Sequence, residues 1–517
     1  MYRLQMTRTF NNKRIAKNTL YMYIRMGVTM LVQLYTSRIV LNTLGVDDYG
    51  IYNIVGSVIV AFSFISGPLG AATQRFYNFE LGRSNEESVN SIFNHSLVIY
   101  SLLSVILLLV IEIAGLWFIN HRMQLPPERM DAALWAFHFS VLGFVFSLLK
   151  VPYESLIVAH ERMSFYAYVS IIEVLLKLLN AFSLIYMTVD KLKLYSVNQL
   201  VITWVILGCV IAYCKRQFIY VRLQKMWDKK VFRQLLGFSG WSLFGSVSAM
   251  SANQGLNVLL NIFYGVAINA AMGIASQVSA SVNQFVTNFQ IAFRPQLIKL
   301  YASDELESLR LLMCQTSKFS YLLLFALVCP LCFNMQFVLE VWLGIPPRYT
   351  AEFCIFILIY ALFETLSAPM CTVVQATGRI RNYQLVISSV MFFNIIVSYI
   401  FLKLGFSPVI VWEIKCCLDL VYLVIRLFFM RRMIQFPIKL FVKDVLLPSV
   451  MITICSIIFM TIISNVFEEG WVKLSITCAS FFILFVPLIA IIGLTKEERL
   501  AVRRITIGKL RHKYGIK

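Results

Sequence analysis

"GVDDYGIYNI" (Gly45–Ile54) and "GVAINAAMGI" (Gly265–Ile274) fall on one another when the chain is shifted against itself by 220 residues. The same shift places "SNEES" (Ser84–Ser88) on "DELES" (Asp304–Ser308), with no gap between the two matches. In both copies the first stretch lies at a turn after a long apolar run, and the second lies in a short polar loop. A match that recurs at one offset indicates a tandem repeat.

The apolar runs around these turns are those of a membrane protein. Hydrophobic residues make up 59% of the chain and charged residues only 14%, whereas a soluble domain has roughly 25% charged residues. A bilayer core takes roughly 20 apolar residues per helix, and fourteen such runs fill nearly the whole chain. Because the period-2 alternation of a membrane barrel is absent, the runs are predicted to be helices. We expect an all-α polytopic membrane protein with fourteen transmembrane helices.

The repeat divides these helices into two bundles. Six is an even number, so two copies of a six-helix unit have the same orientation and are related by an axis along the membrane normal. Two further helices follow the second copy. We predict an N-terminal six-helix bundle (1–217), a basic cytoplasmic linker (218–236), a C-terminal six-helix bundle (237–430), and two additional helices with a basic tail (431–517).

The positive charge of the chain follows its predicted topology. Most Lys and Arg residues outside the spans fall on one side, which by the positive-inside rule places both termini in the cytoplasm. The formal charge of +20 is therefore mostly an orientation signal, with some attraction to anionic lipid head groups. We expect no nucleic-acid partner.

Some charged residues remain inside the spans, where each should face protein or water because an ionisable group at the bilayer centre is costly. Three cations have a carboxylate four positions away, which on a helix is close enough to pair. The pairs are Lys150 with Glu154, Glu173 with Lys177, and Lys415 with Asp419. Neutralisation between helices and a role in a cavity are both consistent with them.

Arg25 and Arg38 in the first span have no such neighbour. Arg25 shares one helical face with Thr29, Gln33 and Thr36, whereas Arg38 lies off that face near the outer end of the span. We interpret Arg25 as facing a water-filled cavity, with snorkelling to the cytoplasmic surface as the alternative. For Arg38 the two interpretations are balanced.

Amides line the seventh and eighth spans. Asn253 and Asn257 are spaced by four, and Gln277 and Gln284 by seven, so each pair lies on one stripe. Amides suit sugar hydroxyls, although hydrogen bonding between helices is the alternative. Arg75 and Arg294 end the second and eighth spans at nearly equivalent points of the repeat, where an orientation signal is equally consistent. The candidate substrate-binding residues are Arg25, Gln33, Arg38, Arg75, Asn253, Asn257, Gln277, Gln284 and Arg294.

A proton or sodium antiporter is expected to carry a carboxylate within a bundle. Glu364 in the tenth span is the carboxylate most isolated from other charge, so it is predicted to be the ion-coupling residue. No catalytic residue, metal site or cofactor is predicted, and the phosphate-binding pattern GxxxxGK is absent. Coupling to a proton or sodium gradient is the expected energy source.

The run "RIVLNTLGVDDYGIYNIVG" (Arg38–Gly56) resembles the first-turn signature of polysaccharide flippases of the MOP exporter superfamily: an Arg, then Leu-Gly, then Tyr-Gly opening the second helix. The fourteen spans and the doubled six-helix plan extend the likeness over essentially the whole chain. It is most similar to Wzx-type O-antigen and capsule repeat-unit transporters.

This resemblance implies a MATE-like, V-shaped pair of bundles in the bacterial inner membrane. Such proteins move an undecaprenyl-diphosphate-linked oligosaccharide from the cytoplasmic to the periplasmic leaflet by alternating access, in lipopolysaccharide and other polysaccharide biosynthesis. The family places cations in a central cavity on the first, second and eighth spans, and Arg25, Arg75 and Arg294 are the nearest matches. The implied partners are the lipid-linked oligosaccharide, the bilayer and other membrane proteins of polysaccharide assembly.

The physics of the cargo agrees with that assignment. A diphosphate is anionic and a glycan is heavily hydrated, so both need replacement solvation inside a membrane, which cations and amides supply.

Two alternatives remain. A multidrug exporter of the same superfamily is expected to have twelve spans and an acidic cavity, but the first span holds no Asp or Glu. A membrane glycan polymerase is expected to have a long outer loop with catalytic Arg and His, and only His121 and Arg122 fit that description.

Overall fold

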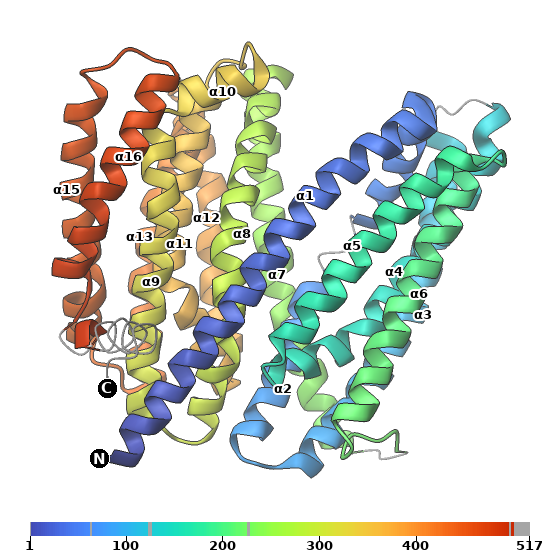
Figure 1. Cartoon of the computed structure of the whole chain (residues 1–517), viewed down its shortest axis with the longest axis horizontal. Coiled ribbons are helices and arrows are strands. Elements are labelled where there is room, and N and C mark those ends of the chain that lie inside the picture. The colour runs from blue at the N-terminus through green and yellow to red at the C-terminus, as the bar shows by residue number, and fades with distance from the viewer. Residues whose placement is uncertain are drawn as a thin grey trace, which may run out of the picture. The chain divides into compact units, whose positions relative to one another are not determined.

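The computed structural model is built from helices. It describes residues 2–60, 62, 65–122, 127–224, 228–495 and 498–500. No strand occurs in these ranges, and most of the predicted basic tail lies outside them. The helices are α1 (Tyr2–Val60), α2 (Ser66–Gly82), α3 (Glu86–Arg122), α4 (Met130–Ala159), α5 (Met163–Tyr186), α6 (Lys191–Gln217), α7 (Lys229–Tyr264), α8 (Val266–Ala302), α9 (Leu306–Phe333), α10 (Met335–Leu343), α11 (Thr350–Thr377), α12 (Arg381–Lys403), α13 (Ile410–Ile434), α14 (Ile438–Phe441), α15 (Leu447–Ser464) and α16 (Trp471–Leu488) (Figure 1).

The chain is a multi-pass membrane protein. Over the part of the chain that the structure describes, nine helices are long and apolar enough to cross a membrane. The other expected spans fall on α1, α2, α7, α8 and α13. All of the predicted substrate-binding residues lie on the first four of these, which makes those helices less apolar. The number of fourteen spans therefore stays a prediction.

The backbone repeats at the spacing that the sequence indicates. Gly45 and Gly265, 220 residues apart, have φ of +81° and +77° and interrupt the helical path at equivalent turns. Ser84 and Asp304, also 220 apart, have φ of 57° and 59°. Positive φ is uncommon outside glycine. Its recurrence at both pairs of aligned positions shows that the two copies share their local geometry.

The apolar run over 49–73 predicts a second transmembrane helix without a break, and this prediction is wrong. Helix α1 ends at Val60, and α2 begins only at Ser66. Pro68 lies in the first turn of α2, where its missing N–H and fixed φ are tolerated. A proline at this point cannot donate to a preceding helical turn, so the helix restarts here.

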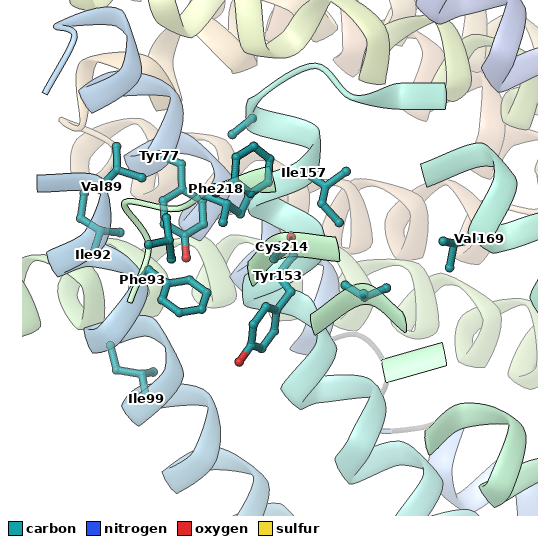
Figure 2. Close-up of a cluster of buried hydrophobic side chains, with 14 of the residues drawn as sticks. Tyr77, Val89, Ile92, Phe93, Ile99, Tyr153, Ile157, Val169, Cys214 and Phe218 are labelled. Atoms are coloured by element: carbon teal, nitrogen blue, oxygen red, sulfur yellow. Dashed lines mark hydrogen bonds between the residues drawn. The ribbon is translucent and has the colours of Figure 1, made fainter. Parts of the chain in front are cut away.

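By their contacts, the described residues form two compact units. Unit 1 comprises residues 1–247, 291–305 and 375–384, and unit 2 comprises 248–290, 306–374 and 385–517. In unit 1, α4 packs against α6 and α1 packs against α5. A buried core holds α2 to α6 together (Figure 2), and it includes Tyr77, Phe93, Tyr153, Ile157, Cys214 and Phe218.

The predicted linker is held against α3. The amide of Arg222 donates to Asn90 Oδ1 at 2.8 Å, and Asn94 Nδ2 donates to the Arg222 carbonyl at 2.9 Å. The amide of Asp228 donates to His95 Nε2 at 2.8 Å. The described part of the linker is therefore fixed to the first bundle by side chains that replace missing backbone partners.

In unit 2 the two additional helices, α15 and α16, pack on α9 (Figure 1). Tyr321 and Thr453 share a hydroxyl hydrogen bond of 2.7 Å. Lys318 Nζ donates to Glu498 Oε2 at 2.6 Å, and both side chains are buried. These polar contacts fasten the C-terminal helices to the second bundle.

Candidate functional site

A cluster of charged side chains lies in unit 1 on α1, α4 and α5. Lys150 Nζ is 3.2 Å from Glu154 Oε1 and 3.6 Å from Glu173 Oε2. Lys177 Nζ donates to Glu173 Oε1 at 2.7 Å. Two of the three predicted pairs are therefore confirmed, and Glu173 joins them. We call Arg25, Lys150, Glu154, Glu173 and Lys177 the unit 1 charge cluster.

Arg25 brings a third cation to this cluster. Its guanidinium carbon lies 5.1 Å from the centroid of the Tyr166 ring, and its charge acts on Glu154. The cluster thus holds three cations and two carboxylates. Because solvation is scarce inside a membrane, an excess positive charge there favours an anionic ligand.

The other predicted residues of the first span lie at the surface of unit 1. Gln33 and Arg38 are both exposed. The hydroxyls of Thr29 and Thr36 donate to carbonyls of their own helix, at 3.1 and 2.7 Å. The exposed predicted contacts of the first span are therefore the Gln33 amide on this face and the Arg38 guanidinium off it.

Arg75 is buried within unit 1, with 7% of its surface exposed. Its Nε donates to the Gln375 carbonyl at 3.1 Å, and its Nη2 donates to the Ala376 carbonyl at 2.9 Å. These are among the last carbonyls of α11, which have no partner within their helix. A cation at a helix C-terminus is also favoured by the helix dipole. The structure gives Arg75 a capping role, and its contact with substrate stays a prediction.

The surroundings of Arg75 fit that capping role. Its guanidinium carbon lies 4.7 Å from the ring centroid of Phe76 and 4.8 Å from that of Phe79. Gly378, with φ of +75°, follows the capped helix end, and a Cβ there would lie 2.8 Å from Arg75 Nη2. Only glycine leaves room for this approach.

The predicted amides of α7 and α8 lie in unit 2. Asn253, Gln277 and Gln284 are exposed, and Asn257 Nδ2 donates to Gln254 Oε1 at 3.2 Å. On helices that are predicted to cross a membrane, exposed amides need water or another polar surface, because lipid offers no hydrogen bonds. Arg294 lies instead in the 291–305 segment of unit 1 and is half-buried.

The third predicted ion pair was wrong. Lys415 Nζ donates to Asn253 Oδ1 at 2.8 Å and lies 4.4 and 4.2 Å from the ring centroids of Tyr360 and Trp412. Among the described residues no carboxylate oxygen comes within 4 Å of this ammonium, Asp419 included. An amide oxygen and two aromatic faces replace the carboxylate as partners of the cation.

Glu364, the predicted ion-coupling residue, is exposed on α11. Its charge acts on Lys415 and Asp419 of α13. Asp419 is only 2% exposed. Glu364 is therefore not isolated from other charge, as the sequence suggested, but belongs to a group of ionisable residues on two helices.

Sequence reasoning missed a charged cluster outside the spans of unit 1. Arg129 Nε donates to Asp48 Oδ1, and its Nη1 donates to Asp190 Oδ2, both at 2.8 Å. Burial raises the pKa of Asp190, but hydrogen bonds from Arg129 and from backbone amides outweigh it and leave that pKa below its ordinary value. No local spacing connects these residues, so the only available signal was the pair of acidic residues in the repeated turn.

Among known protein families, no family model matches the chain. A curated relative, the uncharacterized membrane protein EpsK of Bacillus subtilis (strain 168), is 20% identical over 291 residues. That match covers 54% of this chain and 56% of EpsK, so the chain matches about half the length of this relative.

Solved structures are similar over more of the chain. One is the outward-facing conformation of a multidrug resistance MATE family transporter of the MOP superfamily, with a TM-score of 0.69 and 15% identity. Another is a MOP superfamily transporter from Pyrococcus furiosus, with a TM-score of 0.68 and 16% identity. Each likeness covers 82% of this chain and 96% of the other. The chain therefore has the helical fold of MATE transporters of the MOP superfamily.

Proposed function

We propose that this chain is a flippase of the bacterial inner membrane, with both termini cytoplasmic. It moves an undecaprenyl-diphosphate-linked oligosaccharide, the repeat unit of a polysaccharide such as O-antigen, from the cytoplasmic to the periplasmic leaflet by alternating access. It performs no catalysis. The transporter fold supports the general class, and the charges within the spans support the cargo.

The observation that carries this proposal is the excess positive charge of the unit 1 charge cluster. Lys150 and Lys177 pair with two carboxylates, and Arg25, which lies against the Tyr166 ring, brings the cluster to three cations against two carboxylates. A guanidinium presents several donors in a fixed plane, which suits phosphate oxygens. Arg25 is accordingly the proposed contact for the diphosphate.

The amides of α7 and α8 provide for the other part of the cargo. Asn253, Gln277 and Gln284 are exposed, and an amide both donates and accepts hydrogen bonds. Sugar hydroxyls need both functions when they leave water. These side chains are the proposed contacts for the glycan.

A multidrug exporter is the second candidate, because a solved structure of similar fold is described as a multidrug resistance transporter. The Pyrococcus furiosus transporter, however, is described as having a binding pocket of reversed polarity that suggests a different function. Polarity is thus a reasonable basis for separating functions on this fold. The net positive cluster favours an anionic cargo over a cationic drug.

Deletion of the chain followed by leaflet assignment of the diphosphate-linked repeat unit tests the proposal. Build-up of the unit in the inner leaflet, reversed by the wild-type chain, is the expected result. Unpolymerised units at the outer leaflet would identify a polymerase instead. A loss of resistance to cationic drugs with normal glycan export would identify the multidrug exporter.

A further inference from the structure

Lys415 occupies a cation-binding site that its own bundle provides. Its ammonium has the Asn253 amide oxygen at 2.8 Å and the rings of Tyr360 and Trp412 on its other sides. Trp412 is itself fixed, because its Nε1 donates to Met272 Sδ at 3.1 Å. An amide oxygen and aromatic faces attract any small cation. Here the chain fills that place with its own side chain.

Asp419, one helical turn further along α13, is left without this cation. Its side chain is 2% exposed, and among the described residues its Oδ2 has no hydrogen-bond partner. Burying an ionised carboxylate without a partner costs far more than burying the neutral acid. While Lys415 stays on Asn253, burial therefore favours the protonated form of Asp419, and the buried Arg426 on the same helix acts against it.

The groups around Asp419 come from two helices. Arg426 and Tyr422 share α13 with it, together with Lys415 and Cys416, and α11 contributes Tyr360 and Glu364. Arg426 is buried and donates from Nη1 to Ser367 Oγ on α11. Glu364 is exposed, and its charge acts on the buried acid.

We propose that Asp419 is a proton-binding site and that Lys415 holds the place a metal cation would need, so that this chain uses protons and not sodium. The coupling to transport rests on the proposed function, whereas the proton site itself does not. The site differs from the predicted one, since the exposed Glu364 becomes the entrance and the buried Asp419 the acceptor.

The spacing of the two residues supplies the coupling step. When the Asp419 O–H bond breaks, the proton leaves toward Glu364 and the electron pair stays on the carboxylate. Lys415 is four residues away on the same helix, within reach of that carboxylate. Its ammonium then leaves Asn253 for Asp419 without losing a proton of its own. Proton release thus breaks a contact between α13 and α7, the helix that carries the predicted glycan amides.

Infrared difference spectroscopy tests the proton site without any cargo. The full chain is reconstituted in phosphatidylethanolamine and phosphatidylglycerol vesicles and titrated from acidic to alkaline pH. A carboxylic-acid C=O band that fades as the pH rises is expected in the wild type and in Glu364→Gln, and its loss is expected in Asp419→Asn. An unchanged band in Asp419→Asn would overturn the assignment. Asn is nearly isosteric with Asp, and a melting curve confirms that this variant is folded.

Thermal stability in sodium chloride and in choline chloride at equal ionic strength tests the role of Lys415. The wild type is expected to melt at the same temperature in both salts. Lys415→Ala, which vacates the cation place, is expected to melt at a higher temperature in sodium; Lys415→Gln replaces it if the alanine variant does not fold. A sodium response of the wild type, or none in a folded variant, would overturn the claim that Lys415 replaces a metal cation.

Transport is measured last, with an imposed pH gradient across the same vesicles. Asp419→Asn is expected to lose about tenfold or more of the gradient-driven rate, which corresponds to one charge-assisted interaction. If the infrared result holds and the wild type moves no lipid-linked oligosaccharide, the proposed function fails and the proton site stands. If the wild type transports but Asp419→Asn follows the pH gradient equally well, the coupling role of Asp419 is wrong.

Discussion

Two lysine–carboxylate pairs with the same spacing behave differently in the two units. Lys150 and Glu154 lie 3.2 Å apart in unit 1, whereas Lys415 stays more than 4 Å from Asp419 and donates to Asn253 instead. The neighbouring helix decides the outcome in each case. In unit 1, α5 offers a second carboxylate, Glu173, and so extends the ion pair. In unit 2, α7 offers a neutral amide and leaves the carboxylate without its cation.

Charges that are paired by two partners are held in place, so the unit 1 charge cluster is a fixed arrangement in which three cations face two carboxylates. Lys415 has Asn253 as its partner and Asp419 one helical turn away as an alternative, which gives two arrangements that a proton selects between in our proposal. Our proposals accordingly assign anion binding to unit 1 and the response to one proton to unit 2.

The largest expected effect comes from removing the shared carboxylate of unit 1. Glu173→Gln leaves Lys150 and Lys177 with one carboxylate fewer, which we expect to lower the free energy of unfolding by about 2 kcal/mol, since the group is partly exposed. Asp419→Asn removes no ion pair between described residues, so it should change the free energy of unfolding by less than about 1 kcal/mol. Unfolding of both variants in detergent measures this. Equal losses would remove the distinction between the two units.

The repeated turns sharpen the comparison at the level of the backbone. A Cβ added at Gly45 or Gly265 would meet no neighbouring atom within 4 Å. Substitution by alanine is therefore costly only because both residues have positive φ. We expect Gly45→Ala and Gly265→Ala each to destabilise the protein by about 1 to 2 kcal/mol. Gly27→Ala, at a helical position with equally open surroundings, is the control and should not destabilise it. A clearly different loss of melting temperature in Gly45→Ala and in Gly265→Ala would contradict the equivalence of the two turns.

The cluster around Arg129 gives a smaller effect with a defined pH dependence. The pKa of Asp190 is lowered in the folded protein, so its stabilisation is present above the ordinary pKa of an aspartate and is lost as the pH falls through the folded value. Arg129→Gln should therefore cost about 1 kcal/mol at neutral pH, and this cost should vanish in acid. Melting temperatures of wild type and variant across pH measure it. A difference that grows toward low pH would contradict the assignment.

The sequence predicted well what is local or periodic. The helices, the repeat at Gly45 and Gly265, and the pairs of Lys150 and Lys177 with their carboxylates all depend on spacing along one helix or on one offset. A spacing of four residues on a helix shows which side chains can reach one another, but it does not show which partner a side chain binds. It therefore described Lys415 and Asp419 correctly as neighbours and incorrectly as partners.

Contacts between distant segments could not be predicted. Arg75 binds carbonyls some 300 residues away, and its place in the sequence shows only that it ends a span. Lys415 meets Asn253 across 162 residues. In both cases the partner is a neutral oxygen, which carries no charge pattern that a search for complementary residues would detect.

Flipping of the diphosphate-linked oligosaccharide in reconstituted vesicles, compared for wild type, Arg25→Ala and Arg25→Lys, tests the central claim that unit 1 binds an anionic cargo. We expect Arg25→Ala to lose about tenfold or more of the rate, the worth of one charge-assisted hydrogen bond, and Arg25→Lys to keep part of it. Both variants should fold as the wild type does. Equal rates in all three proteins would show that Arg25 is not a contact for the diphosphate.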